Sequence, residues 1–231
     1  MTVLQSGEVI VSGAFTTAGG VAVNHVARYD PSTNMWSAMG SGVYGTEFGI
    51  KAAVELPGGD IIVGGSLYQV DGVHVNRIAR YNTTSSTWSA FGPGMNNTIR
   101  AMCMLADGDI IAGGDFNSVG SVTARKIARY HSDTNTWSPL GSGIGTDDFD
   151  KVNALAVLQN GDVLVGGYFT IAGGIEVSHL ARYNPTSDTW SNPGSGTSSV
   201  IFSFTPLLNG NIIVSGNFRT AGGVSTRLRD I

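Results

Sequence analysis

The chain has 231 residues, of which 33 are glycine and 13% are charged, and its formal charge is -4 at pH 7. Glycine is about twice as frequent as its ordinary share of roughly 7%, whereas charged residues reach about half of their usual fraction of roughly 25%. The acidic balance offers no positive field to a phosphate backbone, so we expect no nucleic-acid partner. We also expect no membrane insertion, because apolar runs such as Ile110-Ile111-Ala112 fall far short of the roughly eighteen residues that span a bilayer.

One pattern recurs along the whole chain. It begins with a glycine turn that leads into an apolar run, and successive turn glycines stand 52, 49, 53 and 49 residues apart. These glycines are Gly7, Gly59, Gly108, Gly161 and Gly210. A fixed period of this length indicates a repeat architecture in which each copy is one supersecondary unit.

The second half of each copy contains the triplet Ala-Arg-Tyr, and a tryptophan follows seven residues after the tyrosine. The triplets begin at Ala27, Ala79, Ala128 and Ala181, and the tryptophans are Trp36, Trp88, Trp137 and Trp190. Between the triplet and the tryptophan stand Pro, Asn, Asp, Ser and Thr residues, a composition that favours tight turns.

Each copy therefore reads as four short strands in a meander. The first strand is the apolar stretch before the glycine turn, the second is the apolar run, the third holds Ala-Arg-Tyr and the fourth holds the tryptophan. The expected first strands cover residues 52–56, 101–105, 153–158 and 202–207. The second strands are apolar at consecutive positions, so both of their faces must be covered. A propeller blade, packed between two neighbours, meets this requirement.

We predict an all-β fold, a five-bladed β-propeller of four-stranded antiparallel blades in one domain over residues 1–231. The expected blades cover residues 1–42, 48–94, 98–143, 151–196 and 199–231. The last copy lacks its outer strand. It could be three-stranded, be covered by another chain through self-association, or belong to a longer protein. A closed ring is favoured because open blade faces cost about 25 cal/mol per Å² of wet apolar surface.

The segment Tyr29-Asp30-Pro31-Ser32-Thr33-Asn34-Met35-Trp36 resembles the kelch repeat. Ser12 and Ser215 depart from its paired glycines. The segment Phe169-Thr170-Ile171-Ala172-Gly173-Gly174 is similar to longer kelch-like repeats of bacterial surface and secreted proteins. The resemblance implies a propeller, a general binding role and an extracellular or cell-surface location, although no basic-plus-apolar leader precedes Thr2.

A binding face is expected at one end of the blades. In an up-down-up-down blade, the long loops from strand two to strand three and from strand four to the next blade emerge together, and binding residues concentrate on such loops. Two residues before each Ala-Arg-Tyr alanine stands a basic residue, and the last copy offers an equivalent. This set is His25, Arg77, Lys126, His179 and Arg227. They could form a partly basic circle that binds an anionic group, or be solvated residues at strand starts.

Other chemistry-bearing residues have simpler interpretations. The four triplet arginines lie one strand away from Glu8, Asp60, Asp109 and Asp162, which predicts a structural ion pair in each blade. Asp147, Asp148 and Asp150 could hold Ca²⁺, but their spacing matches no calcium loop, so a solvated loop and no metal are expected. Cys103 reads as a small buried apolar residue. No cofactor is expected.

The predicted function is that of a non-catalytic scaffold that binds a protein partner or sits in a surface assembly through its long-loop face. One alternative is a lectin with repeated carbohydrate sites between blades, which would need exposed Trp or Tyr there. The other is an enzyme that uses the central cavity. We expect no enzyme, because the histidines fall in different blades and no nucleophile elbow, phosphate-binding glycine loop or paired Cys/His spacing is present.

Overall fold

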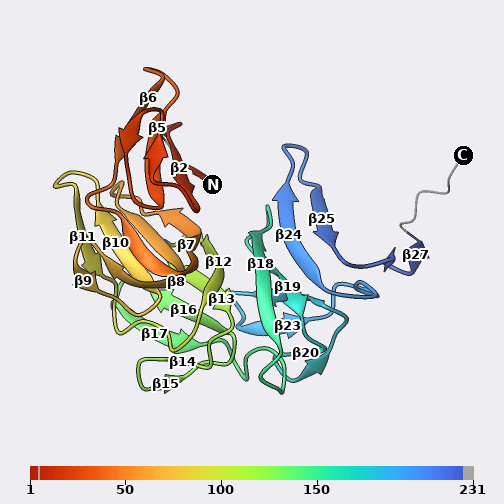
Figure 1. The fold of residues 1–231 in the computed structure, drawn as a ribbon. Coiled ribbons are helices and arrows are strands. Elements are labelled where there is room, and N and C mark those ends of the chain that lie inside the picture. Colours follow the sequence, from red (N-terminus) through yellow and green to blue (C-terminus); the bar gives the residue numbers. More distant parts are fainter. Residues whose placement is uncertain (5, 226–231) are drawn as a thin grey trace, which may run out of the picture. The chain divides into compact units, whose positions relative to one another are not determined.

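A computed structural model describes residues 1–4 and 6–225 of the chain. All regular elements in this part are strands (Figure 1). Within these residues, no helix is long and apolar enough to cross a membrane. The chain divides into two compact units, Met1–Met102 and Cys103–Ile231, which are taken in turn.

The first unit contains two antiparallel sheets. The first has the order β1-β2-β5-β6 and consists of β1 (Thr2–Val3), β2 (Val9–Ser12), β5 (Val26–Asp30) and β6 (Met35–Ala38). The second has the order β11-β10-β8-β7, with β9 paired to β8. It consists of β7 (Val43–Glu55), β8 (Ile61–Val70), β9 (Val73–His74), β10 (Ile78–Asn82) and β11 (Thr87–Ala90). Both sheets follow the predicted meander of four strands.

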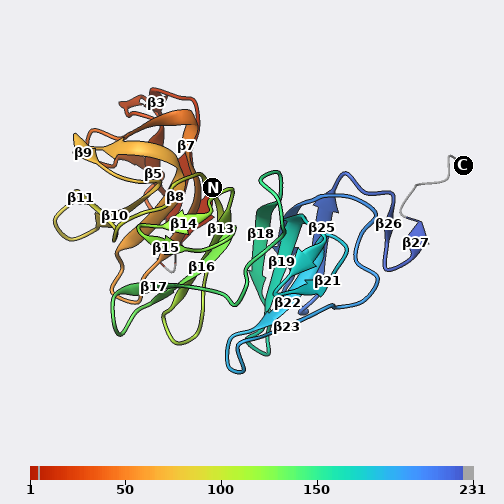
Figure 2. The ribbon, with the colours of Figure 1, turned by 90° about the horizontal axis from the view of Figure 1, so that it is seen from below.

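The boundary between the units falls inside β12, the first strand of the third sheet. This sheet has the order β12-β13-β16-β17, with β12 (Ile99–Met104), β13 (Ile110–Gly114), β16 (Ile127–His131) and β17 (Thr136–Pro139). The fourth has the order β18-β19-β22-β23 and is seen from below in Figure 2. Its strands are β18 (Lys151–Val157), β19 (Val163–Tyr168), β22 (Leu180–Asn184) and β23 (Thr189–Ser191).

The fifth sheet pairs β24 (Ile201–Pro206) with β25 (Ile212–Gly216). The residues expected to form the rest of its third strand begin at position 226 and lie outside the described part of the chain. Three four-stranded sheets, one five-stranded sheet and a two-stranded one thus stand where five blades were expected. The blade count of the complete propeller stays a prediction.

The segments between strands two and three were expected to be loops, and this expectation was wrong. They contain two-residue hairpins: β3 (Thr17–Ala18) with β4 (Val21–Ala22), β14 (Ser118–Val119) with β15 (Val122–Thr123), β20 (Ile171–Ala172) with β21 (Ile175–Glu176), and β26 (Thr220–Ala221) with β27 (Val224–Ser225). Gly173 and Gly174, between β20 and β21, have φ angles of 57° and 85°. Two positive φ angles at the turn are what a tight type I′ hairpin requires, so the glycine pair determines this shape.

The apolar second strands of the second, third and fourth sheets are largely covered on both faces, as predicted, whereas β2 is half-buried and Ile213 of β25 is 55% exposed. Ile61, Ile62 and Val63 are each 0% exposed. Packing between sheets explains the glycine that follows. A Cβ added at Gly113 would lie 2.4 Å from a side-chain carbon of Val152 in the next sheet, so this glycine makes room for a β-branched neighbour. A Cβ added at Gly64 would likewise lie too close to Ile99, and one added at Gly166 too close to Ile201.

The repeated arginines, tyrosines and tryptophans belong to the scaffold. The predicted ion pairs form in all four copies, between Arg28 and Glu8, Arg80 and Asp60, Arg129 and Asp109, and Arg182 and Asp162. Each tyrosine pairs with its tryptophan across two strands, with ring centroids 4.8 to 5.4 Å apart. The Trp88 indole N–H also donates to the Met39 carbonyl of the preceding sheet, at 2.9 Å. These contacts tie strands and neighbouring sheets together.

Candidate functional site

Within each unit, the hairpins and the segments that connect one sheet to the next lie at the same end of the sheets, as predicted. We call this the hairpin end, and we call the connecting residues 40–43, 92–95, 141–144 and 194–197 the straps. In the strap of residues 141–144, Gly143 accepts a hydrogen bond from Gly173 in the next hairpin at 2.8 Å. Ile144 donates to Arg125 of the preceding sheet at 3.0 Å. Each strap of this kind holds two hairpins together through main-chain atoms.

The same two-sided bonding recurs in the straps of residues 40–43 and 194–197, and in the strap of residues 92–95 Met95 donates to the Asn76 carbonyl at 2.9 Å. In the first unit, Asp71 donates to the Gly42 carbonyl at 3.1 Å, and Val43 donates to the Asn24 carbonyl at 3.1 Å. In the second unit, Gly222 donates to Gly196 at 2.9 Å, and Thr197 donates to Ser178 at 3.0 Å. Main-chain hydrogen bonds therefore hold the hairpins and straps together at the hairpin end of each unit.

The predicted basic residues share an uncommon backbone conformation. His25, Arg77, Lys126 and His179 have φ angles of 63°, 68°, 63° and 61°, whereas only a few per cent of non-glycine residues are left-handed. Main-chain bonds hold this conformation in place. For example, Lys126 donates to the Phe116 carbonyl at 2.7 Å and accepts from Gly114 at 2.9 Å.

The side chains of these residues turn back onto the end of the second strand in their own sheet. The His25 Nδ1 lies 3.1 Å from the Gly13 carbonyl, and Arg77 Nη1 donates to the Ser66 carbonyl at 3.4 Å. Lys126 Nζ donates to the Asp115 carbonyl at 3.2 Å. His25 and Arg77 belong to the first unit, Lys126 and His179 belong to the second, and Arg227 lies outside the described residues.

Among the four described residues of this set, His179 differs in what its side chain contacts. Its ring stacks on Tyr168 with centroids 5.7 Å apart and planes 25° apart, and its buried Nδ1 has no hydrogen-bond partner. Burial lowers the pKa of the His179 imidazole, so the neutral ring is favoured. The neutral, stacked ring serves as a support for Tyr168.

Lys126 differs from the other three because it is only 1% exposed. Its Nζ also donates to the Asp148 carbonyl at 3.3 Å. Burial lowers the pKa of Lys126, and the carboxylates of Asp148, Asp115 and Asp150 oppose that shift. Lys126 thus anchors the loop of residues 145–150 to the third sheet.

The acidic residues of that loop stabilise its main chain. The Asp150 carboxylate accepts hydrogen bonds from the Thr146 and Asp147 amides at 2.7 and 2.9 Å. The Asp147 carboxylate accepts from the Phe149 and Asp150 amides at 2.8 and 3.1 Å. In the described part of the chain, no group of three or more His, Cys, Asp or Glu residues is arranged to hold a metal ion.

The anchored loop presents an aromatic side chain to solvent. Phe149 is 79% exposed, although the loop around it is tied down by Lys126, Asp147 and Asp150. Other exposed aromatic residues at the hairpin end are Tyr44 and Tyr68 in the first unit and Tyr168 in the second, at 43%, 46% and 46%. These residues were missed from sequence because none belongs to the repeated pattern. Their irregular position was the available signal.

The first four sheets contain antiparallel four-stranded meanders, and a glycine of one sheet packs against a β-branched residue of the next. These features define the class of β-propellers. The chain belongs to the family of the Rax2 C-terminal beta propeller domain, whose model matches residues 47–157 and 142–231. A second family model, the beta-propeller domain of unknown function DUF5122, matches residues 4–32. A comparison with curated proteins finds no relative of the chain.

Solved structures with a similar fold include two extracellular domains. The chain is 15% identical to the extracellular domain of the one component system BT4673 from B. thetaiotaomicron, with a TM-score of 0.55 over 85% of the chain. The chain is 14% identical to the extracellular domain of the hybrid two component system BT4673, with a TM-score of 0.53 over 84% of the chain. The chain spans 24% of each of those proteins. These likenesses extend to the fold alone.

Proposed function

We propose that the chain is an extracellular binding module that contacts a protein partner through its hairpin end. The observation that carries the proposal is the exposure of Phe149 on a loop whose backbone is fully tied down. An exposed phenylalanine is unfavourable in water, and a rigid loop loses little conformational entropy when it binds. Rigid aromatic side chains of this kind dominate the energetics of protein interfaces.

Other exposed apolar side chains also lie at the hairpin ends of the two units, namely Tyr44, Tyr68, Tyr168 and the hairpin residues Val73, Val122, Ile175 and Val224. Apolar side chains are exposed at the opposite ends as well: Met35 at 64% and, in the turn after β24, Leu207 at 40% and Leu208 at 107%. The anchoring of the loop around Phe149, and not apolar exposure alone, therefore distinguishes the proposed site. The extracellular location is proposed because the two similar structures are extracellular domains.

Carbohydrate binding is the second candidate function. Tyr168, half exposed and stacked on His179, offers a flat surface on which a sugar ring could lie. The repeated aromatic residues offer less, because Tyr81, Tyr130 and Tyr183 are buried at 4%, 7% and 2% exposure. A sugar site of this kind would therefore occur once in the second unit and would not recur in every blade.

The test is a binding comparison with matched surface variants. The purified chain is immobilised and exposed to the cell-surface and secreted proteins of its source organism, retained proteins are identified by mass spectrometry, and each affinity is measured. We expect Phe149→Ser to weaken binding at least tenfold. Met35→Ser, which removes an equally apolar side chain at the opposite end, should leave the affinity unchanged.

Two outcomes would contradict the protein-binding proposal. One is a partner whose affinity falls with Met35→Ser and not with Phe149→Ser, since that would move the interface to the other end. The other is binding on a glycan array that depends on Tyr168 and saturates at one sugar per chain, which would favour the carbohydrate candidate.

A further inference from the structure

The third sheet brings four polar side chains together on one face, at the end away from the hairpins. Ile110 pairs with Tyr130, so Asp109 and His131, one residue further along, stand opposite each other. Arg129 pairs with Ser138. Because side chains alternate between the two faces of a strand, Asp109, Arg129, His131 and Ser138 share a face.

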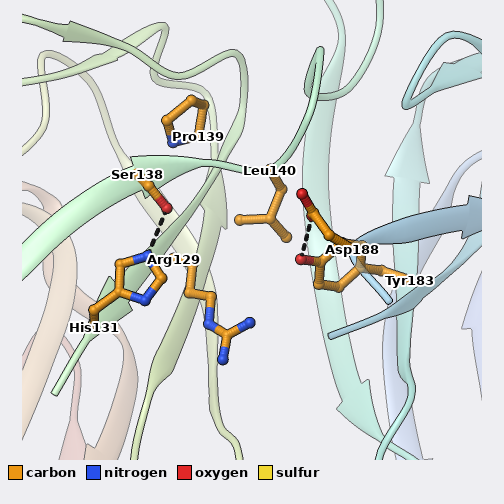
Figure 3. Close-up of a pocket in the computed structure, with 7 residues that line it drawn as sticks. All are labelled: Arg129, His131, Ser138, Pro139, Leu140, Tyr183 and Asp188. Atoms are coloured by element: carbon orange, nitrogen blue, oxygen red, sulfur yellow. Dashed lines mark hydrogen bonds between the residues drawn. The ribbon is translucent and has the colours of Figure 1, made fainter. Parts of the chain in front are cut away.

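Three of these side chains form an ordered series. The His131 Nε2 lies 2.8 Å from the Ser138 Oγ, a contact drawn in Figure 3. The His131 Nδ1 lies 3.2 Å from the Asp109 Oδ2. With the Nδ1 proton facing the carboxylate, Nε2 is free to accept the Ser138 hydroxyl proton. Serine, imidazole and carboxylate in this order are the arrangement that activates a serine nucleophile.

The carboxylate is held in place by its own partners. Asp109 accepts hydrogen bonds from the Ser132 amide at 2.8 Å and from Arg129 Nε at 2.7 Å. Burial alone would raise the pKa of Asp109, but the hydrogen bonds from Ser132 and Arg129 together hold the pKa below its ordinary value. Asp109 is therefore ionised and fixed in the orientation that a histidine partner needs.

The other sheets show what this position does without a histidine. Asn82 and Asn184 occupy the place of His131 and donate to the buried carboxylates of Asp60 and Asp162 at 3.3 and 2.8 Å. The serine is repeated as Ser37, Ser89 and Ser191. Among the four complete sheets, only the third has a base between its carboxylate and its serine.

His131, the residue that departs from the repeat, lines an open pocket between the third and fourth sheets of the second unit. Its walls are formed by Arg129, His131, Ser138, Pro139, Leu140, Tyr183 and Asp188, as Figure 3 shows. His131 is about one third exposed, at 33%, so both its ring and the neighbouring hydroxyl can be reached. Pro139 and Leu140 provide an apolar wall beside Ser138, and Arg129 provides a positive charge.

We propose that Ser138 is a reactive nucleophile toward carboxylic esters with a small acyl group, with His131 as general base and Asp109 as the positioning carboxylate. Ser138 Oγ attacks the ester carbonyl carbon while its proton passes to His131 Nε2. The carbon–oxygen bond to the alcohol then breaks, and the alcohol leaves with that proton. A water molecule, deprotonated by His131, attacks the acyl-serine, releases the carboxylic acid and restores Ser138. This site lies away from the hairpin end and is independent of the binding function proposed there.

The experiment uses the full chain with a fluorophosphonate probe and with p-nitrophenyl acetate. The probe is expected to add once per chain, on the peptide that contains Ser138, and the acetate should give an acetylated Ser138 peptide. Ser138→Ala should abolish the adduct. His131→Asn, which introduces the residue that the second and fourth sheets carry, should preserve the fold and slow labelling at least a hundredfold.

Ser89→Ala is the matched control, because Ser89 has the same place in the second sheet beside Asn82; it should label as the original chain does. Labelling that is equally fast in His131→Asn, or spread over several serines, would overturn the proposal. So would a folded chain that reacts with neither reagent. Phe149→Ser is expected to label normally, so failure of the binding proposal and failure of this one are separate results.

Discussion

The ammonium group of Lys126 donates to the main-chain carbonyl of Asp148 at 3.3 Å, so a buried lysine in the third sheet holds a loop that displays Phe149. The same group bonds to the Asp115 carbonyl. This relationship joins the interior of the sheet to the proposed binding surface.

Replacing Lys126 with methionine is expected to loosen the loop while leaving the sheets folded. The carbonyls of Asp115 and Asp148 lose their donor, which costs about 1 to 3 kcal/mol of folding stability. Hydrogen exchange followed by mass spectrometry should show faster exchange in residues 145–150. Arg77→Met, which removes the corresponding contact to Ser66 in the second sheet, should leave that loop unchanged. Unaltered exchange in Lys126→Met would mean that the acidic caps alone hold the loop.

Gly143→Ala tests the straps. Gly143 has a φ of 78°, and an added Cβ would lie 2.5 Å from the Arg125 carbonyl oxygen. The left-handed conformation alone costs about 1 to 2 kcal/mol for alanine, and the clash with main-chain atoms adds to this. We expect a loss of at least about 2 kcal/mol in urea unfolding.

Gly174→Ala separates the cost of the left-handed backbone from the cost of the clash. Gly174 has a φ of 85°, but its nearest neighbour would be 3.7 Å away, so only the conformational cost of about 1 to 2 kcal/mol applies. Equal losses for the two variants would show that close approach contributes nothing at Gly143.

Trp88→Phe tests the bond between neighbouring sheets in the first unit. The substitution keeps an aromatic ring but removes the donor to the Met39 carbonyl. A buried carbonyl left without a partner costs about 1 to 3 kcal/mol, and this loss should appear as a lower midpoint in urea. Trp36→Phe, at a half-buried position, should cost less. A greater loss at Trp36 would contradict the role assigned to the Trp88 indole.

The pKa of His179 predicts a dependence of stability on pH. Burial lowers that pKa in the folded chain, whereas the unfolded value is about 6.5. The unfolded state therefore binds the proton first as the pH falls, and stability present above about pH 6.5 is lost progressively below it. Thermal unfolding between pH 7.5 and 5 should show this decline. His179→Asn, with a residue that tolerates a left-handed backbone, should reduce the slope.

Much of the fold was predictable because it repeats. The apolar runs, the triplets and the tryptophans recur often enough to locate strands, and the pairing of Arg80 with Asp60 followed from their separation by one strand. The hairpins were missed because a two-residue strand such as Ile171–Ala172 is too short to produce a recognisable alternation. The left-handed backbone at His25 and Lys126 was missed for a different reason. It is imposed by main-chain bonds to the second strand, which no side-chain pattern reveals.

The candidate sites were likewise predictable where they repeat and not predictable where they do not. The repeated position of Lys126 indicated where to look, but its burial and its hold on Asp148 depend on how one particular loop folds. Ser138 and Asp109 seemed ordinary because each has equivalents in other copies. The informative departure was His131, which stands where two other copies have asparagine. Its meaning became visible only when the strand register placed it between the carboxylate and the hydroxyl.

The straps have a consequence for how such a chain can change over evolutionary time. They join one blade to the next through carbonyls and amides at positions such as Gly143 and Gly173, so the bonds themselves use no side chain. Hairpin residues other than these glycines can therefore change while the connection between blades stays intact. A gene that duplicates or exchanges whole blades would inherit compatible joints at once, so new recognition surfaces could arise by shuffling copies as readily as by point mutation.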